Sequence, residues 1–446
     1  MPARRPPVSA RRPAPRDAIL TVKNAVASLW QSAVADTIAA PPATPLTAAA
    51  LTAAPVGDSP DMTHPMLRAA SLQAAALDRG AAPPQVAGIA DLIGDCADFA
   101  WSLACAKLTG NRRSARSYEE LLGPTGQCDP LWATCVATFL DYYQLRGGRI
   151  PYVRYQDVGD FAFNDLPDAA TIALFADWGT GLPVARHVLK MIAAHEPHVA
   201  IHLGDIYYSG TSRENHRNFL RLCRGHLPAS TRIFTLSGNH DMYSGGVGYY
   251  ELIRGLSQPA SYFCLRNAHW QFVALDTGLH DHDPFTVNSG MTELDPHELA
   301  WCTDKLNTAA GRRTVLLSHH PYFSAFACIG GKPVNAKLEA QLAAALPAET
   351  IWFWGHEHLL AIYDLHLNVR GRCIGHGAIP VSVEEHPYKI ECPEVPIVAT
   401  PLGHDDVAYY NGYAIMKLDG PRASVEYYSD SGAPTPDYSE AFGAWR

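Results

Sequence analysis

From residue 171 onward, short apolar runs alternate with stretches of helical periodicity. The runs rich in β-branched and aromatic residues predict strands, and the stretches between them, with apolar residues three and four positions apart, predict helices. The expected strands are 171–177, 198–205, 232–239, 272–276, 314–318 and 350–354. The expected helices are 182–194, 213–225, 247–256, 296–309 and 336–345. For the fourth helix, Asp295 is the expected cap, Pro296 suits the first turn and Glu298 sits at the capping-box position.

After residue 358 the helical spacing stops. Segments 370–379, 412–418 and 424–428 read as antiparallel strands, and Asp-Gly-Pro at 419–421 reads as a turn. Alternation followed by a β-rich end predicts an α/β fold of two stacked mixed sheets flanked by helices, a four-layer αββα sandwich. We assign this domain to residues 166–432 and a C-terminal tail to 433–446.

The first third of the chain has a different composition. Residues 1–85 are rich in Ala, Pro, Thr and Arg and show little periodicity, so they bury too little apolar surface to offset their ordering entropy and are expected to be disordered. Apolar residues recur at helical spacing from Ile89 to Leu103, and a second apolar cluster covers 131–145. We therefore predict a helical accessory region over 86–165.

Polar residues that bind metals follow the predicted strands at the points where these end. Gly204-Asp205 closes the apolar run Ala200–Leu203, and four more segments have the same build. Their candidate donors are Asp177, Asp205, Tyr208, Asn239, His319, His356 and His358. Because strands of an α/β sheet present ligand sites at their carboxyl ends, one pocket could collect all of these side chains.

Seven donors are too many for one tetrahedral ion. They suit two ions that share a carboxylate, and Asp205 is the natural bridge because its two oxygens can hold both. His356 and His358 are two residues apart, so in an extended segment their rings lie on one side. The sequence thus predicts a binuclear metal site.

The ordered motifs Asp-x-Gly (177–179), Gly-Asp-x-x-Tyr (204–208), Gly-Asn-His-Asp (238–241), His-x-Pro (319–321) and Gly-His-x-His (355–358) resemble those of the calcineurin-like metallophosphoesterase superfamily, most nearly its purple acid phosphatase branch. The resemblance covers about residues 170–430. It implies that Asp177, Asp205, Tyr208 and His358 hold the first ion. It also implies that Asp205, Asn239, His319 and His356 hold the second. His240 matches the superfamily's catalytic histidine, which contacts the phosphate and can protonate the leaving oxygen.

One position departs from the general superfamily pattern. Most members have a histidine two residues after the first aspartate, where this chain has Gly179. Tyr208 is expected to replace it, as a tyrosinate does in purple acid phosphatases, and a phenol of pKa about 10 ionises readily only on a strongly polarising cation. We therefore expect ferric iron at the Tyr208 site and divalent Fe, Zn or Mn at the other.

The resemblance implies hydrolysis of a phosphate ester by a metal-bound hydroxide, with a phosphomonoester as the expected substrate. One alternative is a phosphodiesterase of the cyclic-nucleotide type, but that group normally keeps the histidine that Gly179 replaces. Another is a non-catalytic scaffold that uses the same fold to bind a protein partner. Such scaffolds usually lose several ligands, whereas every motif is present here.

Composition narrows the possible partners and compartments. The formal net charge of -9 argues against general binding of nucleic acids. No apolar run approaches the roughly 20 residues that a membrane helix needs. The ten cysteines are scattered without Cys-x-x-Cys pairs, which favours free thiols in a reducing compartment. The Arg-rich amino terminus has no apolar core behind it and is not an expected export signal. We expect a cytoplasmic protein.

A few further residues invite a functional interpretation. His320 is next to a candidate ligand, and His376 lies in Gly-His-Gly near a strand end, so each is a weaker candidate for contact with substrate. Ser244-Gly245-Gly246 is expected to be a turn and not a phosphate loop, because no lysine follows it. Cys302 is expected in the core beside apolar residues of its helix.

Overall fold

The computed structural model describes residues 142–143, 147–207, 209–282, 290–379, 381, 383, 386–406 and 408–443. Within them, fourteen strands form two mixed sheets. The first sheet has the order β1-β5-β6-β7-β8-β10-β9-β11, and the second has the order β14-β13-β12-β2-β3-β4. The predicted pair of stacked mixed sheets is confirmed.

The six-stranded sheet has a parallel half and an antiparallel half. The strands β2 (Ala169–Phe175), β3 (Val199–His202) and β4 (Arg232–Thr235) are parallel, and β12 (Gly412–Asp419) joins β2 antiparallel in the register Ala414↔Leu174. β13 (Arg422–Ser429) and β14 (Tyr438–Phe442) complete it. Part of the predicted C-terminal tail is therefore an edge strand: the backbone of β14 pairs with β13, and Phe442 packs into the core.

The eight-stranded sheet is built around parallel strands β6 (Trp270–Ala274), β7 (Arg313–Leu317), β8 (Thr350–Trp354) and β10 (Val369–Ile374). Antiparallel β5 (Phe263–Arg266) and β9 (Leu360–His366) flank this group. Short β1 (Ala162–Phe163) and β11 (Ile397–Ala399) form the edges.

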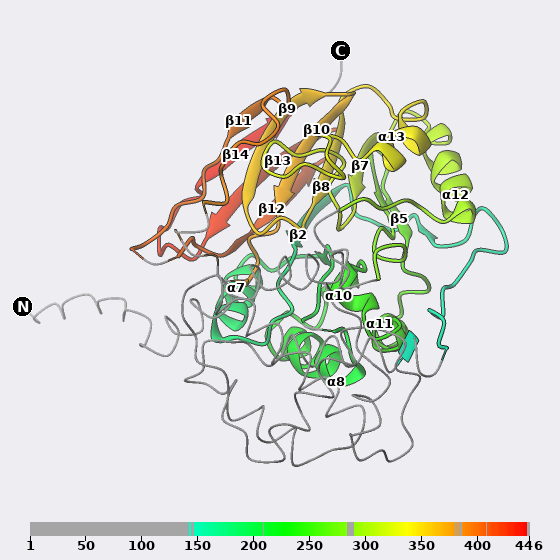
Figure 1. The fold of residues 1–446 in the computed structure, drawn as a ribbon, viewed down its shortest axis with the longest axis horizontal. Helices are drawn as coiled ribbons and strands as arrows, with labels where there is room; N and C mark the ends of the chain where they lie inside the picture. The colour runs from blue at the N-terminus through cyan, green and yellow to red at the C-terminus, as the bar shows by residue number, and fades with distance from the viewer. Residues whose placement is uncertain are drawn as a thin grey trace, which may run out of the picture.

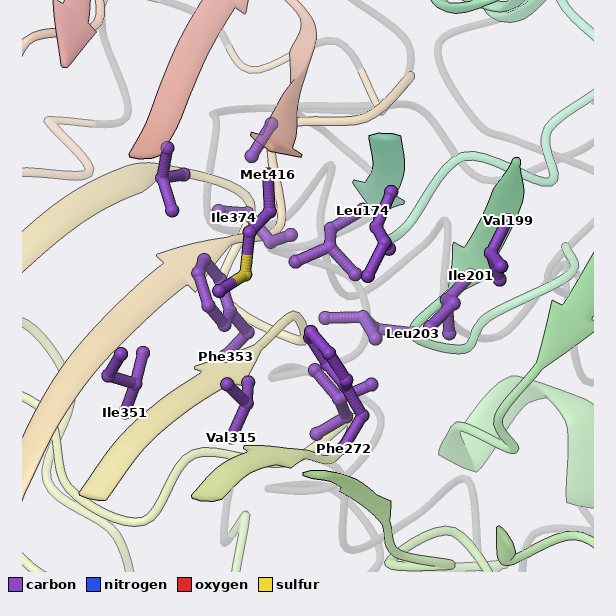
Figure 2. Packing of buried hydrophobic residues seen from close by; sticks show 14 of the residues in the cluster. Leu174, Val199, Ile201, Leu203, Phe272, Val315, Ile351, Phe353, Ile374 and Met416 are labelled. Carbon is purple, nitrogen blue, oxygen red and sulfur yellow. The ribbon is translucent and has the colours of Figure 1, made fainter. Parts of the chain in front are cut away.

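Successive residues of the central strands pack into different cores. Ile172 and Leu174 face the other sheet, whereas Ala173 and Phe175 face outward onto helices. Figure 2 shows Leu174, Ile201 and Leu203 on one side of this inner layer and Phe272, Val315 and Phe353 on the other. Each large apolar side chain buried in this way contributes about 1.5–3 kcal/mol. Burial on both faces explains why these strands read as continuous apolar runs.

Helices cover the outer faces of both sheets and complete the four layers. α12 (Pro296–Asn307) and α13 (Ala336–Leu342) pack on the eight-stranded sheet through Trp301, Cys302 and Leu338. α7 (Pro183–Ala193), the π-helix η2 (Asn215–Leu220) and α9 (Arg221–His226) pack on the six-stranded sheet. Short α8 (Ser212–Glu214), α10 (Asn239–Met242) and α11 (Val247–Gly255) lie with α7 below the strands in Figure 1.

One local prediction at the start of α12 needs correction. Asp295 caps α12 by accepting from the His297 amide, as expected, but Glu298 forms no capping box. Its buried carboxylate accepts instead from the Asp276 amide (2.7 Å) and from the Tyr152 hydroxyl (2.9 Å). The sequence pattern cannot reveal these partners because they come from distant segments.

The predicted N-terminal regions lie largely outside the described residues, so the disordered tail over 1–85 and most of the helical region over 86–165 stay predictions. Residues 147–165 are described and contain no helix. They run extended and add β1 to the edge of the eight-stranded sheet, so a helix was the wrong prediction for this part. Among the described helices, none combines the length and apolar character needed to cross a membrane.

Candidate metal centre

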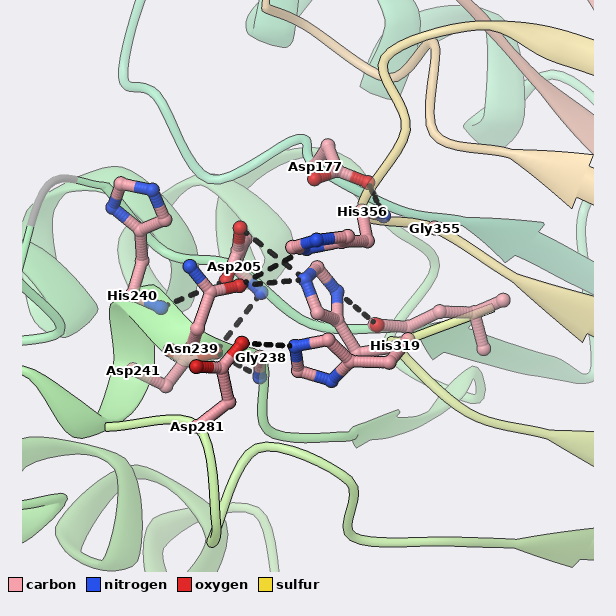
Figure 3. Close-up of polar contacts among 12 residues, drawn as sticks. Asp177, Asp205, Gly238, Asn239, His240, Asp241, Asp281, His319, Gly355 and His356 are labelled. Carbon is pink, nitrogen blue, oxygen red and sulfur yellow. Dashed lines mark hydrogen bonds and ion pairs between the residues drawn. The ribbon is translucent and has the colours of Figure 1, made fainter. Parts of the chain in front are cut away.

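The candidate donors lie where parallel strands of both sheets end. Asp177 follows β2, Asp205 follows β3, and Asn239 and His240 begin α10 behind β4. His319 follows β7, and His356 follows β8. Figure 3 shows these side chains converging on one region from the two sheets. The sandwich thus brings together residues far apart in the sequence, as in the hydrogen bond from the His356 amide to Asp177, 179 positions away.

Three of these residues have left-handed backbones. The φ angles are 53° at Asp177, 72° at Asp205 and 67° at His356. For residues with a Cβ this conformation costs roughly 1–2 kcal/mol each. Backbone strain of this kind concentrates at functional sites, where the surrounding fold pays for it.

Glycines of the motifs admit the carboxylates. A Cβ on Gly238 would lie 2.1 Å from Asp205 Oδ1, and a Cβ on Gly355 would lie 2.5 Å from Asp177 Oδ2. Any side chain at these two positions would displace a carboxylate, so glycine is required by the close approach.

One set of donor atoms gathers around Asp177. Its Oδ1 accepts from the Tyr207 hydroxyl at 2.9 Å and lies 3.4 Å from His358 Nε2. The Tyr207 oxygen lies 3.1 Å from the same His358 nitrogen. Asp177 Oδ2 accepts from the His356 amide at 2.9 Å, which fixes the carboxylate.

A second set gathers around Asn239. Its Oδ1 lies 3.2 Å from His319 Nε2 and 3.2 Å from His356 Nδ1. His319 Nε2 also lies 3.4 Å from Asp205 Oδ2. The other His319 nitrogen, Nδ1, faces the Leu203 carbonyl at 3.0 Å, and donation there leaves Nε2 as the atom that can bind a metal.

Asp205 connects the two sets. One carboxylate oxygen of Asp177, one of Asp205 and one His319 nitrogen lie within 4.8 Å of one another. Asp205 Oδ1 accepts from the His240 amide at 3.0 Å, and Asp241 Oδ2 accepts from the amides of Asp205 and Gly238, both at 2.9 Å. The Asp205 carboxylate and the Asp205 backbone are therefore each fixed by a hydrogen bond.

Burial and charge set the protonation of the site. Burial opposes ionisation of Asp205, but the attraction of His319, His240 and His356 lowers the pKa of its carboxyl below the usual value. Burial also opposes protonation of His319, yet the neighbouring Asp205 raises the pKa of its ring to about 9. Burial, with Asp177 and Asp205 nearby, raises the pKa of the Tyr207 phenol well above 10. The buried carboxylates therefore attract positive charge, and a bound cation would compete with these protons.

The donor chemistry fits two metal ions. Carboxylate, amide, phenol and imidazole atoms in two connected sets are the ligand types of binuclear hydrolytic sites. Asp177 and His358 would hold one ion, Asn239, His319 and His356 the other, with Asp205 between. These six of the seven predicted ligands are brought together, whereas Tyr208 lies outside the described residues.

The other predicted histidines have different surroundings. His240 is buried, with its ring 4.5 Å from that of Tyr207 and 4.7 Å from that of Tyr243. His320 is fully buried, and its ring nitrogens contact Thr277 Oγ1 at 3.0 Å and Asp281 Oδ2 at 2.9 Å. It therefore packs behind the site beside His356. His376 is also buried. Substrate contact by His320 or His376 stays a prediction.

Sequence reasoning missed Tyr207 and the pair of His320 with Asp281. The Gly-Asp-x-x-Tyr spacing draws attention to Tyr208 and away from the adjacent Tyr207, whose hydroxyl donates to Asp177. Asp281 lies in a polar loop with no motif around it, so nothing in the local sequence marks it as a partner of His320.

The fold and the donor set resemble those of the metallophosphoesterase class. Residues 170–360 match the family model described as calcineurin-like phosphoesterase. Comparison with curated proteins finds no match.

Solved structures that resemble the chain share little sequence with it. They include a dimetal phosphatase from Danio rerio, with 13% identity, 61% of this chain and 98% of that chain covered, and a TM-score of 0.39. PhoD has 13% identity, with 63% and 69% covered and a TM-score of 0.43. GAP50, the anchor in the inner membrane complex of Plasmodium, has 13% identity, with 62% and 90% covered and a TM-score of 0.42.

Proposed function

We propose that the protein is a binuclear-metal hydrolase that cleaves phosphate monoesters. The observation that carries the proposal is the pair of donor sets that meet at Asp205, where a carboxylate of Asp177 and a nitrogen of His319 lie within 4.8 Å of it. The buried carboxylates of Asp205 and Asp177 each lie 3.4 Å from an imidazole nitrogen, of His319 and His358 respectively. Buried carboxylates are costly unless they are paired or coordinate a metal, and a metal at each set would meet that requirement.

When bound, a pair of metal ions orients the phosphoryl oxygens, neutralises their charge and lowers the pKa of water to supply the nucleophile. The chain contributes the frame for this chemistry. Asp205 sets the separation of the two sets, and Asp241 and the His240 amide fix its orientation. Asn239 keeps its oxygen toward both histidines of the second set.

His240 is the proposed catalytic residue. Its backbone is tied to Asp205, and its ring is packed between two tyrosine rings, so the imidazole stands at the edge of the donor sets in Figure 3. From there it can donate a proton to the departing ester oxygen, a role worth typically 10²- to 10⁴-fold in rate.

The purple acid phosphatase resemblance leads to a narrower proposal. A tyrosinate ligand with Asp177 and Asp205 supplies three negative charges, which suit a ferric and a divalent ion. Such a protein should absorb broadly in the visible. A colourless protein that is fully active with zinc or manganese would refute the iron assignment without refuting hydrolysis.

The deciding experiment measures metal content and phosphate release on one preparation. Purified protein, loaded in turn with Fe, Zn and Mn, is assayed with a chromogenic phosphate monoester and with the corresponding diester. Two ions per chain with faster monoester cleavage is the expected result. Faster diester cleavage would support the phosphodiesterase alternative, and a well-folded protein without metal or turnover would support a binding scaffold.

A further inference from the structure

We propose that Tyr207, not the Tyr208 indicated by motif spacing, supplies the phenol oxygen of the first metal site. This inference rests on the proposed function in so far as it assumes a metal at the Asp177 set. It concerns a different question, namely which side chain fills the position that a histidine occupies in most of the superfamily and that Gly179 leaves open here.

The distances around Tyr207 are those of ligands on one ion. Its oxygen lies 2.9 Å from Asp177 Oδ1 and 3.1 Å from His358 Nε2, and these two atoms are 3.4 Å apart. Two ligands at right angles on an octahedral ion, each about 2.1 Å from it, lie about 3.0 Å apart. The three atoms therefore already form a triangle of the size of one coordination face.

The backbone holds Tyr207 in this place. Its amide donates to the Gly179 carbonyl at 3.0 Å, and its own carbonyl accepts from Asn218 Nδ2 at 3.0 Å. The tyrosine is only 3% exposed. A residue fixed at both backbone groups and buried against the site has little freedom to swing out.

Gly179 is what permits this arrangement. Gly179 and Ile206 form a parallel β-bridge, and a Cβ on Gly179 would lie 2.8 Å from Ile206 Cα and 2.9 Å from Ile206 Cγ1. A histidine at 179 would therefore collide with the segment that carries Tyr207. The absence of a histidine at 179 and the presence of the Tyr207 phenol at the site are therefore linked. Glycine at 179 leaves room for residues 206–207, and the tyrosine two residues after Asp205 takes the ligand position that a histidine at 179 would have.

Binding of the Tyr207 phenol to a metal requires the loss of one proton. The O–H bond of Tyr207 breaks, an oxygen–metal bond forms, and the proton leaves to solvent. The hydroxyl now donates to Asp177 Oδ1, so ligation replaces a shared proton by a shared cation.

The test compares Tyr207→Phe with Tyr208→Phe, two variants that each remove one hydroxyl from neighbouring residues of the same type. Each is loaded with ferric iron plus zinc and, separately, with zinc alone. Bound metal per chain, metal affinity by calorimetry, the visible spectrum and the melting temperature are recorded. Tyr207→Phe should lose the visible band and bind its first-site metal ~10-fold or more weakly, since even outer partners of a ligand are worth 10–100-fold. Tyr208→Phe should match the wild type.

The opposite result overturns the inference: loss of the band and of first-site affinity in Tyr208→Phe, with both kept in Tyr207→Phe. Unchanged affinity in both variants also overturns it. If the wild type binds two ions but cleaves no phosphate ester, the proposed function fails while the comparison of the variants still decides the ligand. If the wild type binds no metal, both the proposed function and the Tyr207 assignment are wrong. Gly179→Ala gives an independent check, because displacement of residues 206–207 should weaken the same site while the second site keeps its metal.

Discussion

Asp205 is the residue on which both donor sets depend. Replacement by Asn keeps the shape and the oxygen that accepts the His240 amide, but it removes the negative charge that His319 faces at 3.4 Å. We expect Asp205→Asn to bind fewer than two ions per chain and to lose ~10²-fold or more in turnover, as the loss of a bridging ligand requires. Elemental analysis and steady-state kinetics measure the two effects.

Asp165→Asn is the matched control, because that carboxylate is 70% exposed and pairs with Arg232 on the surface. It should keep both ions and full turnover. Full metal occupancy and full rate in Asp205→Asn would remove the basis for a binuclear hydrolase.

His240→Asn should separate proton donation from metal binding. Its ring packs beside the rings of Tyr207 and Tyr243, and it is not one of the predicted ligands, so we expect both ions to remain. Turnover should fall by 10²- to 10⁴-fold for an alkyl phosphate, whose leaving oxygen needs a proton, and far less for a nitrophenyl phosphate. His226→Asn, at the end of α9, serves as the control. An equal loss with both leaving groups would exclude His240 as the proton donor.

At the scale of single residues, six of the seven predicted donors lie together in the structure, because each stands shortly after an apolar run that forms a strand. The sequence could not distinguish Tyr207 from Tyr208, since the choice depends on how the chain passes Gly179. Glu298 shows the same limit. Its position predicts a capping box, but a fully buried carboxylate binds whichever donors the tertiary fold provides.

At the scale of elements, β3 carries a buried titratable group that should make stability depend on pH. His202 is fully buried, with Nδ1 3.0 Å from Thr235 Oγ1. Burial lowers the pKa of this ring to about 3 from 6.5. The unfolded chain therefore takes up a proton below pH 6.5 that the folded chain refuses, so the stability from neutral His202 is present above pH 6.5 and is lost as the pH falls toward 3.

Between pH 7.5 and pH 5 this one group should lower the free energy of unfolding by about 2 kcal/mol, since pH 5 is about 1.5 units below the unfolded pKa. His202→Gln can keep a hydrogen bond to Thr235 but cannot titrate. Denaturant unfolding at the two pH values should show a smaller loss in the variant than in the wild type. Equal losses would show that His202 does not stay neutral in the fold.

Elements buried on both faces were the easiest to predict. β2, β3, β7 and β8 are nearly continuous apolar runs, because their alternate residues enter different cores. β5, β9 and β14 were missed. β14 is an edge strand of alternating exposure, Tyr438–Phe442, and it is held by pairing with β13, which a local pattern does not reveal. β9 starts two residues after His358, so the motif hides its beginning.

At the scale of the whole molecule, the net charge of -9 disfavours the approach of an anionic substrate. Binding of a phosphate ester therefore requires that the site itself carry positive charge. Two metal ions supply that charge locally, whereas the rest of the surface need not attract anions. Turnover should therefore depend weakly on ionic strength compared with an enzyme that steers its substrate by a broad basic surface.

The N-terminal third bears on the site through a contact that is within the described residues. The Tyr143 hydroxyl donates to the Met242 carbonyl at 2.6 Å, and Met242 ends α10, the helix that begins with Asn239 and His240. We expect deletion of residues 1–85 to leave turnover within about twofold, because a segment of this composition adds little to a packed core. Tyr143→Phe, in contrast, removes a hydrogen bond to the helix that carries His240, the proposed proton donor, and should lower kcat several-fold, with metal content unchanged. Steady-state kinetics and metal analysis on both variants measure this. A large loss of turnover in the deletion, with the melting temperature preserved, would show that residues 1–85 complete the site.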